Sequence, residues 1–148
     1  MIKMASRSAV FSGLFIAGAI GILASCATMS PMMGGQKIAL DGASEVPAVA
    51  TTATGSATVD IKADRSVTAS VTVSGMTATA SHIHEAAAGA NGPVIVPFVK
   101  TGDNTFAAAE GAKLTEAQYE SYKAGKLYVN VHSAKNPGGE VRGQLKGN

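Results

Sequence analysis

The 148-residue sequence contains a single cysteine, Cys26, and no tryptophan. One cysteine cannot form a disulfide within the chain, which excludes the class of small secreted proteins held together by disulfides. Aromatic residues make up only 5% of the sequence, so we expect a core built mainly of Val, Ala, Ile and Leu. A core of such small side chains favours a thin structure made of two β layers.

The chain also has little net charge. Its formal charge is +2, and two of its basic residues, Lys3 and Arg7, lie in an N-terminal stretch with the features of an export signal. Without that stretch the basic residues balance the acidic ones, and the basic residues are scattered rather than clustered. This pattern excludes nucleic acid as a partner.

Motifs for covalent or phosphate chemistry are absent as well. No serine lies in a Gly-x-Ser-x-Gly stretch, and the glycine-containing stretch GANGP (89–93) precedes no predicted helix. We therefore predict no catalytic residue, and we favour a binding protein over an enzyme.

The N-terminal stretch is predicted to direct export. Lys3 and Arg7 precede a run of small apolar residues, SAVFSGLFIAGAIGILAS, which is typical of a secretory signal peptide rather than of a permanent membrane span. The run ends in LASC (23–26), which resembles the bacterial lipobox. That resemblance implies that Cys26 is lipidated and becomes the first mature residue, with an unmodified thiol near an ordinary cleavage site as the alternative.

Three parts follow from this interpretation: a signal peptide over 1–25, a flexible tether over 26–36, and a folded domain over 37–148. The tether is rich in small residues and contains Pro31 and a Gly-Gly pair. The lipid would anchor the protein in the bacterial cell envelope, at the outer membrane, on its periplasmic or its surface side.

From residue 36 onward the sequence consists of short segments rich in Val, Thr and Ile. In 66–75, Val67, Ala69, Val71 and Val73 alternate with Ser and Thr, the period of a strand with one buried face. The other segments predicted as strands are 36–40, 55–63, 78–86, 93–100, 126–134 and 139–147. Such strands predict an all-β sandwich or barrel, and the thin core favours the sandwich.

One segment, 114–126, departs from the strand pattern. Thr115 and Gln118 have the spacing of a capping box, and Gly125 stands where a helix would end. We expect one short helix here, in a crossover between two strands.

All three histidines of the chain fall in two of the predicted strands. Side chains at i and i+2 of a strand share a face, so His82 and His84 point the same way while Ile83 points into the core. In LYVNVH (127–132), Leu and two Val residues form the apolar face, and His132 lies on the opposite one. All three histidines are therefore expected to face away from the core.

If the two strands are neighbours, about 4.8 Å apart, the three imidazoles converge. Imidazole binds copper, zinc, iron and nickel, so we predict a metal site made by His82, His84 and His132. Asn130, on the same face as His132, is predicted to orient one of the rings. The alternative is that the histidines are ordinary exposed strand residues, because a shared face does not establish a shared site.

Several stretches in order, LDGASEVPAV, SHIHEAAAGANGPVI, LYVNVHS and GGEVRGQL, carry a resemblance to the CHRD domain. This domain is named for chordin and is common in exported bacterial proteins. The sequence departs from the family pattern at Ala48, Ala86 and Ser133, none of them a histidine. The resemblance implies an immunoglobulin-like or superoxide-dismutase-like β-sandwich. In chordin these domains sit in an extracellular antagonist that binds growth factors, so the resemblance also implies a protein-binding or adhesion module as an alternative function.

Copper/zinc superoxide dismutase is similar in one further respect, since it holds copper with His-x-His on one strand and a later Val-His on another. This distant likeness implies copper at His82, His84 and His132, with zinc as the alternative ion. The chain lacks the fourth histidine and the paired cysteines of that enzyme, so a redox enzyme is the least favoured function. The favoured function is a lipid-anchored envelope protein that binds copper.

Three other charged residues are not predicted to be metal ligands. Glu85 is expected to be a local surface charge. Glu140 and Arg142 are i, i+2 neighbours in the last predicted strand, and we expect an exposed pair that contributes little. The alternative for Arg142 is a position beside the histidine face, where it would attract an anion.

Overall fold

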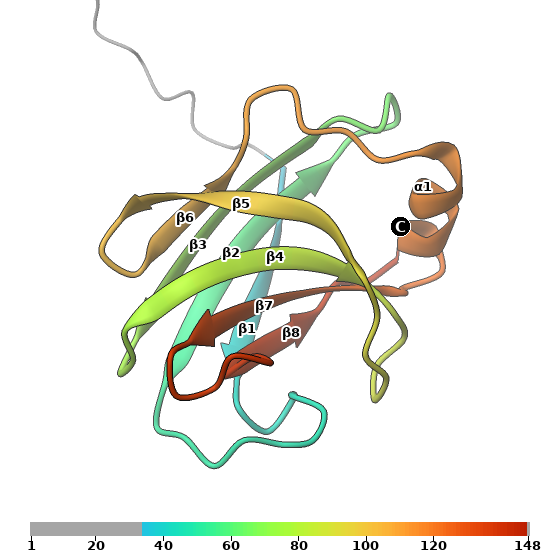
Figure 1. Cartoon of the computed structure of the whole chain (residues 1–148). Helices are drawn as coiled ribbons and strands as arrows, with labels where there is room; N and C mark the ends of the chain where they lie inside the picture. The colour runs from blue at the N-terminus through green and yellow to red at the C-terminus, as the bar shows by residue number, and fades with distance from the viewer. Residues whose placement is uncertain (1–33, 148) are drawn as a thin grey trace, which may run out of the picture. The chain divides into compact units, whose positions relative to one another are not determined.

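The computed structural model describes residues 34–147 (Figure 1). The predicted signal peptide (1–25), the lipidation of Cys26 and residues 26–33 of the predicted tether lie outside the described residues. The elements are β1 (Gln36–Asp41), β2 (Thr54–Ile61), β3 (Val67–Ser74), β4 (Ala78–Glu85), β5 (Val94–Gly102), β6 (Thr105–Ala108), α1 (Glu116–Lys123), β7 (Leu127–Ser133) and β8 (Val141–Gln144). Over residues 34–147, no helix is long and apolar enough to cross a membrane.

The eight strands form one closed barrel in the order β1-β2-β3-β6-β5-β4-β7-β8, with antiparallel pairing throughout. The all-β prediction is confirmed, but the strands form a ring where two separate sheets were predicted. Two short pairings make this difference: β1 meets β8 only at Asp41 and Arg142, and β3 meets β6 over three residue pairs. The alternation of apolar residues identifies the buried face of each strand, but it does not reveal whether the outer strands pair.

The predicted strand segments correspond to β1–β5, β7 and β8. The alternation in β3 is complete, since Val67, Ala69, Val71 and Val73 are buried and the residues between them are exposed. Strand β6, with the sequence TFAA, was missed because it is short and half of it is alanine, which has a low β propensity.

Helix α1 begins with the predicted capping box. The Thr115 hydroxyl accepts a hydrogen bond from the Gln118 backbone N–H at 3.2 Å, and the Gln118 side chain accepts one from the Thr115 N–H at 2.8 Å. The helix lies between β6 and β7, which are not neighbours in the barrel, so the predicted crossover is confirmed. Ser121 of α1 donates to Glu85 at 2.6 Å and thereby ties the helix to the end of β4.

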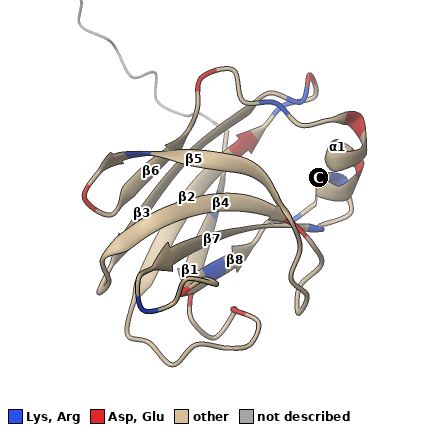
Figure 2. Ribbon diagram, in the orientation of Figure 1, with Lys and Arg blue, Asp and Glu red and all other residues tan. Residues whose placement is uncertain are grey.

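The interior of the barrel is filled by Val, Ala, Ile and Leu from all eight strands, with Phe106 as a large buried aromatic residue. Charged residues lie mainly in the loops and on α1, and most of the strand surface carries no charge (Figure 2). The core is therefore of the small-residue type that the composition predicts.

The prediction of an exposed Glu140–Arg142 pair is wrong. Glu140 is 5% exposed and Arg142 is 1% exposed. Glu140 accepts hydrogen bonds from Thr51 at 2.7 Å and from Ser133, so it is held by a loop and by β7 rather than by Arg142. Loops over 42–53 and 86–93 cover this part of the barrel, and a local sequence pattern gives no sign of that cover.

Candidate metal centre

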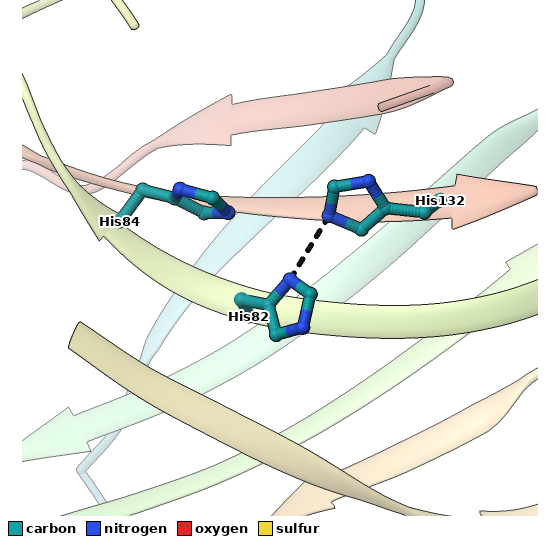
Figure 3. A group of neighbouring side chains, drawn as sticks. All are labelled: His82, His84 and His132. Carbon is teal, nitrogen blue, oxygen red and sulfur yellow. Dashed lines mark hydrogen bonds between the residues drawn. The ribbon is translucent and has the colours of Figure 1, made fainter. Parts of the chain in front are cut away.

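The three histidines come together because β4 and β7 are neighbours in the barrel. His82 lies opposite Asn130 and His84 lies opposite Tyr128 in this pairing. Ile83, between the two histidines of β4, is fully buried in the core, so both rings point outward as predicted. One ring nitrogen from each of the three histidines lies within 4.8 Å of the others (Figure 3).

The closest contact within the cluster joins the two strands. His82 Nδ1 lies 2.9 Å from His132 Nε2, and the ring centroids of these residues are 4.8 Å apart. Ligand nitrogens around a tetrahedral ion, each at about 2.0–2.1 Å from the metal, would lie roughly 3.3 Å apart. Small ring movements are therefore enough to bring the three nitrogens to a common ion.

Two of the rings are fixed in orientation by backbone carbonyls. His84 Nδ1 donates a hydrogen bond to the Gly92 carbonyl at 2.9 Å, and His132 Nδ1 donates one to the Pro137 carbonyl at 2.9 Å. A carbonyl only accepts hydrogen bonds, so both Nδ1 atoms carry the proton, and the Nε2 atoms carry the free lone pair. Metal-binding histidines are held in this way by their second nitrogen.

These two carbonyls are site groups that the sequence did not indicate. A backbone oxygen has no residue type of its own, so no motif marks Gly92 or Pro137. The only sequence signal was indirect: both residues lie in turn stretches, NGP and NPGG, that follow the histidine strands.

His84 Nε2 is buried and has no hydrogen-bond partner. The residue is 8% exposed, and buried polar atoms without partners are rare in folded proteins. Among residues 34–147, the other such side-chain atoms are Glu45 Oε1 and Asn130 Oδ1. Asn130 lies on the histidine face, as expected, and its role in orienting a ring remains a prediction.

Tyr128 and Arg142 form a stack of side chains against the His84 ring. The Tyr128 ring lies nearly parallel to the His84 ring, at 10° and 4.9 Å between centroids, and its hydroxyl accepts a hydrogen bond from the Gly92 N–H at 3.3 Å. The guanidinium carbon of Arg142 lies 3.5 Å from the Tyr128 ring centroid. The order of the strands, β4-β7-β8, is also the order of these three side chains.

Arg142 also anchors the loop that covers His84. Its guanidinium donates to the carbonyls of Ala87 and Ala90, at 3.2 and 2.9 Å, and to the Asn91 side chain at 3.3 Å. Arg142 therefore lies beside the histidine face, as the alternative interpretation had it, with both terminal nitrogens bonded to protein oxygens. The loop in turn supplies the Gly92 carbonyl that orients His84.

All three rings favour the neutral form. Burial, together with the neighbouring rings of His132 and His84, lowers the pKa of His82 to about 4. Burial also lowers the pKa of His84 and of His132, against the opposing effect of the carbonyls that their Nδ1 atoms meet. At neutral pH the cluster therefore offers three uncharged imidazoles, the form that binds a metal ion.

Comparison with known proteins gives one family. The CHRD domain matches residues 37–145, which include all of the barrel except its first residue, Gln36, and all three histidines. No curated protein and no solved structure gives a significant match.

Proposed function

The chain belongs to the CHRD domain family, and we propose that its domain binds one metal ion, with copper as the first candidate. The ligands are His82 Nδ1, His84 Nε2 and His132 Nε2. In this proposal the ion replaces the hydrogen bond between His82 and His132.

The observation that carries the proposal is the convergence of three nitrogens, of which two already have their lone pairs directed inward. They lie within 4.8 Å of one another, and the Gly92 and Pro137 carbonyls hold the rings of His84 and His132. The buried His84 Nε2 without a partner supports the same conclusion, since a bound ion would satisfy it.

Copper is preferred on the chemistry of the ligands. Among the divalent first-row metals an imidazole site binds copper most tightly, with zinc as the next candidate. Zinc stays the alternative ion, because three histidines can hold zinc with a water molecule as its fourth ligand.

We propose further that the domain is held at the bacterial cell envelope. The signal peptide over 1–25 would direct export, Cys26 would carry the lipid, and residues 26–36 would tether the domain. Incorporation of labelled fatty acid into the exported protein tests this, because the label should disappear in Cys26→Ala. A variant that keeps the label would overturn the lipid anchor.

The test of metal binding uses the domain from residue 27 onward, which contains the whole barrel. Titration with Cu(I), Cu(II) and Zn(II), read by competition with a chromophoric chelator, should show one ion per domain for wild type. His82→Ala and His132→Ala should each weaken binding at least a hundredfold. Thr68→Ala, an exposed change on β3, is the matched control and should bind like wild type.

Two other outcomes of the titration would indicate a different function for the domain. No binding at micromolar metal would overturn the metal site and leave the protein-binding or adhesion function that the family suggests. Turnover of superoxide or peroxide by the loaded domain would instead indicate a redox enzyme.

A further inference from the structure

The ligand set of the proposed site carries no charge. The cluster consists of three imidazoles without a carboxylate or a thiolate. A divalent ion bound by neutral ligands keeps its full double charge, and removing that charge from water is costly unless an anion joins it. A monovalent ion in the same place keeps one charge, so its transfer costs much less.

The protein also buries a positive charge of its own, Arg142, close to His84. Arg142 is 1% exposed, and the guanidinium of arginine is always charged in proteins. Within residues 34–147 the only ion pair closer than 4 Å joins Lys123 to Glu120, so no carboxylate pairs with Arg142 at that range. Its four hydrogen bonds all go to neutral oxygens, those of Ala87, Ala90, Asn91 and Gln144.

The position of this charge makes it effective at the metal site. Only the Tyr128 ring separates the Arg142 guanidinium from the His84 ring, at 3.5 Å from one and 4.9 Å from the other. Little water can enter such a stack, because Tyr128, Arg142 and His84 are all buried. Charges in buried places are screened much less than charges at a surface.

The nearby acid, Glu45, does not fully cancel the charge of Arg142. Glu45 lies next to the Asn130 side chain. Both border Gly139, where an added Cβ atom would lie 2.5 Å from Glu45 Oε1 and 2.6 Å from Asn130 Nδ2. Burial raises the pKa of Glu45, which favours its uncharged form, although Arg142 acts in the opposite direction.

We propose that the three-histidine site selects a monovalent soft ion, Cu(I), over divalent ions, and that the buried charge of Arg142 contributes to this selection. The inference rests on the proposed metal function and goes beyond it by assigning the oxidation state. Cu(I) has a filled d shell and accepts three nitrogen ligands without a fourth. The neutral ligands and the buried cation then act together, because both penalise the higher charge of Cu(II).

The reduction potential of the copper-loaded domain measures the preference directly. Wild type should have a potential above that of free copper in the same buffer. A unit charge at this range, at an effective dielectric constant of about 20, changes the relative affinity for the two ions by roughly tenfold. Arg142→Gln should therefore lower the potential by about 59 mV, the equivalent of tenfold for one electron.

Arg142→Lys is the matched control. Lysine keeps the charge and loses the forked hydrogen bonds to the loop, so its potential should stay near that of wild type. Equal shifts in the glutamine and lysine variants would show that loop anchoring, not charge, sets the potential, and would overturn the role of Arg142.

The wild-type measurements stand even if both variants fail to fold. Ag(I), a redox-inert stand-in for Cu(I), should displace Zn(II) from the wild-type domain, and Cu(I) should bind more tightly than Cu(II). One ion per domain with Cu(II) preferred would overturn this inference and leave the metal function intact. Absence of binding by any of these ions would instead overturn the metal function itself.

Discussion

His82 Nδ1 and His132 Nε2 lie 2.9 Å apart although fifty positions separate the two residues in the sequence. Since Pro137 holds the proton of His132 on Nδ1, His82 Nδ1 is the donor in this contact. A metal ion bound at the cluster would have to displace that proton, which the other nitrogen of the His82 ring could take. Binding therefore requires a change of tautomer at His82 but no net release of a proton from it.

Metal should stabilise the folded domain, because the three ligands lie close together only after β4 and β7 pair. A ligand that binds the native state alone raises the free energy of unfolding by about 2.7 kcal/mol at a hundred times its Kd. Urea denaturation with and without Cu(I) under reducing conditions measures the gain. His132→Ala should abolish it, whereas Thr68→Ala should keep it; a gain of equal size in both variants would mean that copper stabilises the domain elsewhere.

Acidification should weaken the metal-free domain between pH 6.5 and about 4. In the unfolded chain His82 takes up a proton below its ordinary pKa of about 6.5, whereas in the folded domain burial and the two neighbouring histidine rings lower the pKa to about 4. Between these values the unfolded state binds more protons, so the free energy of unfolding falls as the pH falls. Burial lowers the pKa of His84 and His132 in the same direction.

Urea denaturation at several pH values from 7.5 to 4 checks this sign. His82→Gln removes one of the titrating rings, so its stability should fall less steeply over the same range. A slope equal to that of wild type would show that other groups, such as carboxylates, dominate the acid response.

Gln144 should be important for stability although it is only half-buried. Its amide nitrogen donates to the carbonyls of Ala86 and Gly125, both at 2.9 Å, and its oxygen accepts from Arg142 at 3.1 Å. Gln144→Ala leaves these partners unsatisfied and should cost about 2 kcal/mol in the free energy of unfolding. A loss below 0.5 kcal/mol by urea denaturation, the usual range of surface substitutions, would contradict this role.

Thr115→Ala removes the N-cap of α1 and should cost about 1 kcal/mol in the same assay. The helix does not contact the histidine cluster directly, so the affinity for metal should stay within twofold of wild type. Thr115→Ser keeps the capping hydroxyl and should restore most of the stability. A large loss of metal affinity in Thr115→Ala would show that α1 positions β4 through the contact between Ser121 and Glu85.

Local patterns predicted the elements and the direction of their side chains well. The alternation around Val71 identified a strand with one buried face, and the spacing of Thr115 and Gln118 identified the start of the helix. The i, i+2 spacing of His82 and His84 also predicted that both rings would leave the core. These successes share a cause: each depends on residues within a few positions of one another.

The order of the strands could not be predicted from the sequence. For that reason neither the closure of the barrel nor the contact of His132 with the other two rings could be predicted. The burial of Arg142 was missed for the same reason, because the loop residues that accept its hydrogen bonds lie 51 to 55 positions away. Part of the histidine face is also covered, since the loop after β4 folds back over His84 and leaves it 8% exposed. Contacts of this range depend on topology, which period and spacing do not encode.

The barrel is closed by the pairing of β1 with β8, and this short contact is where we expect the ring of strands to open. Asp41 and Arg142 form the only registered pair at this closure, and Arg142 also supports Tyr128 beneath His84. A fluctuation that parts the first strand from the last therefore disturbs the support of a proposed metal ligand. Occupancy by an ion should accordingly slow the exchange of amide hydrogens along this line, far from the ion itself.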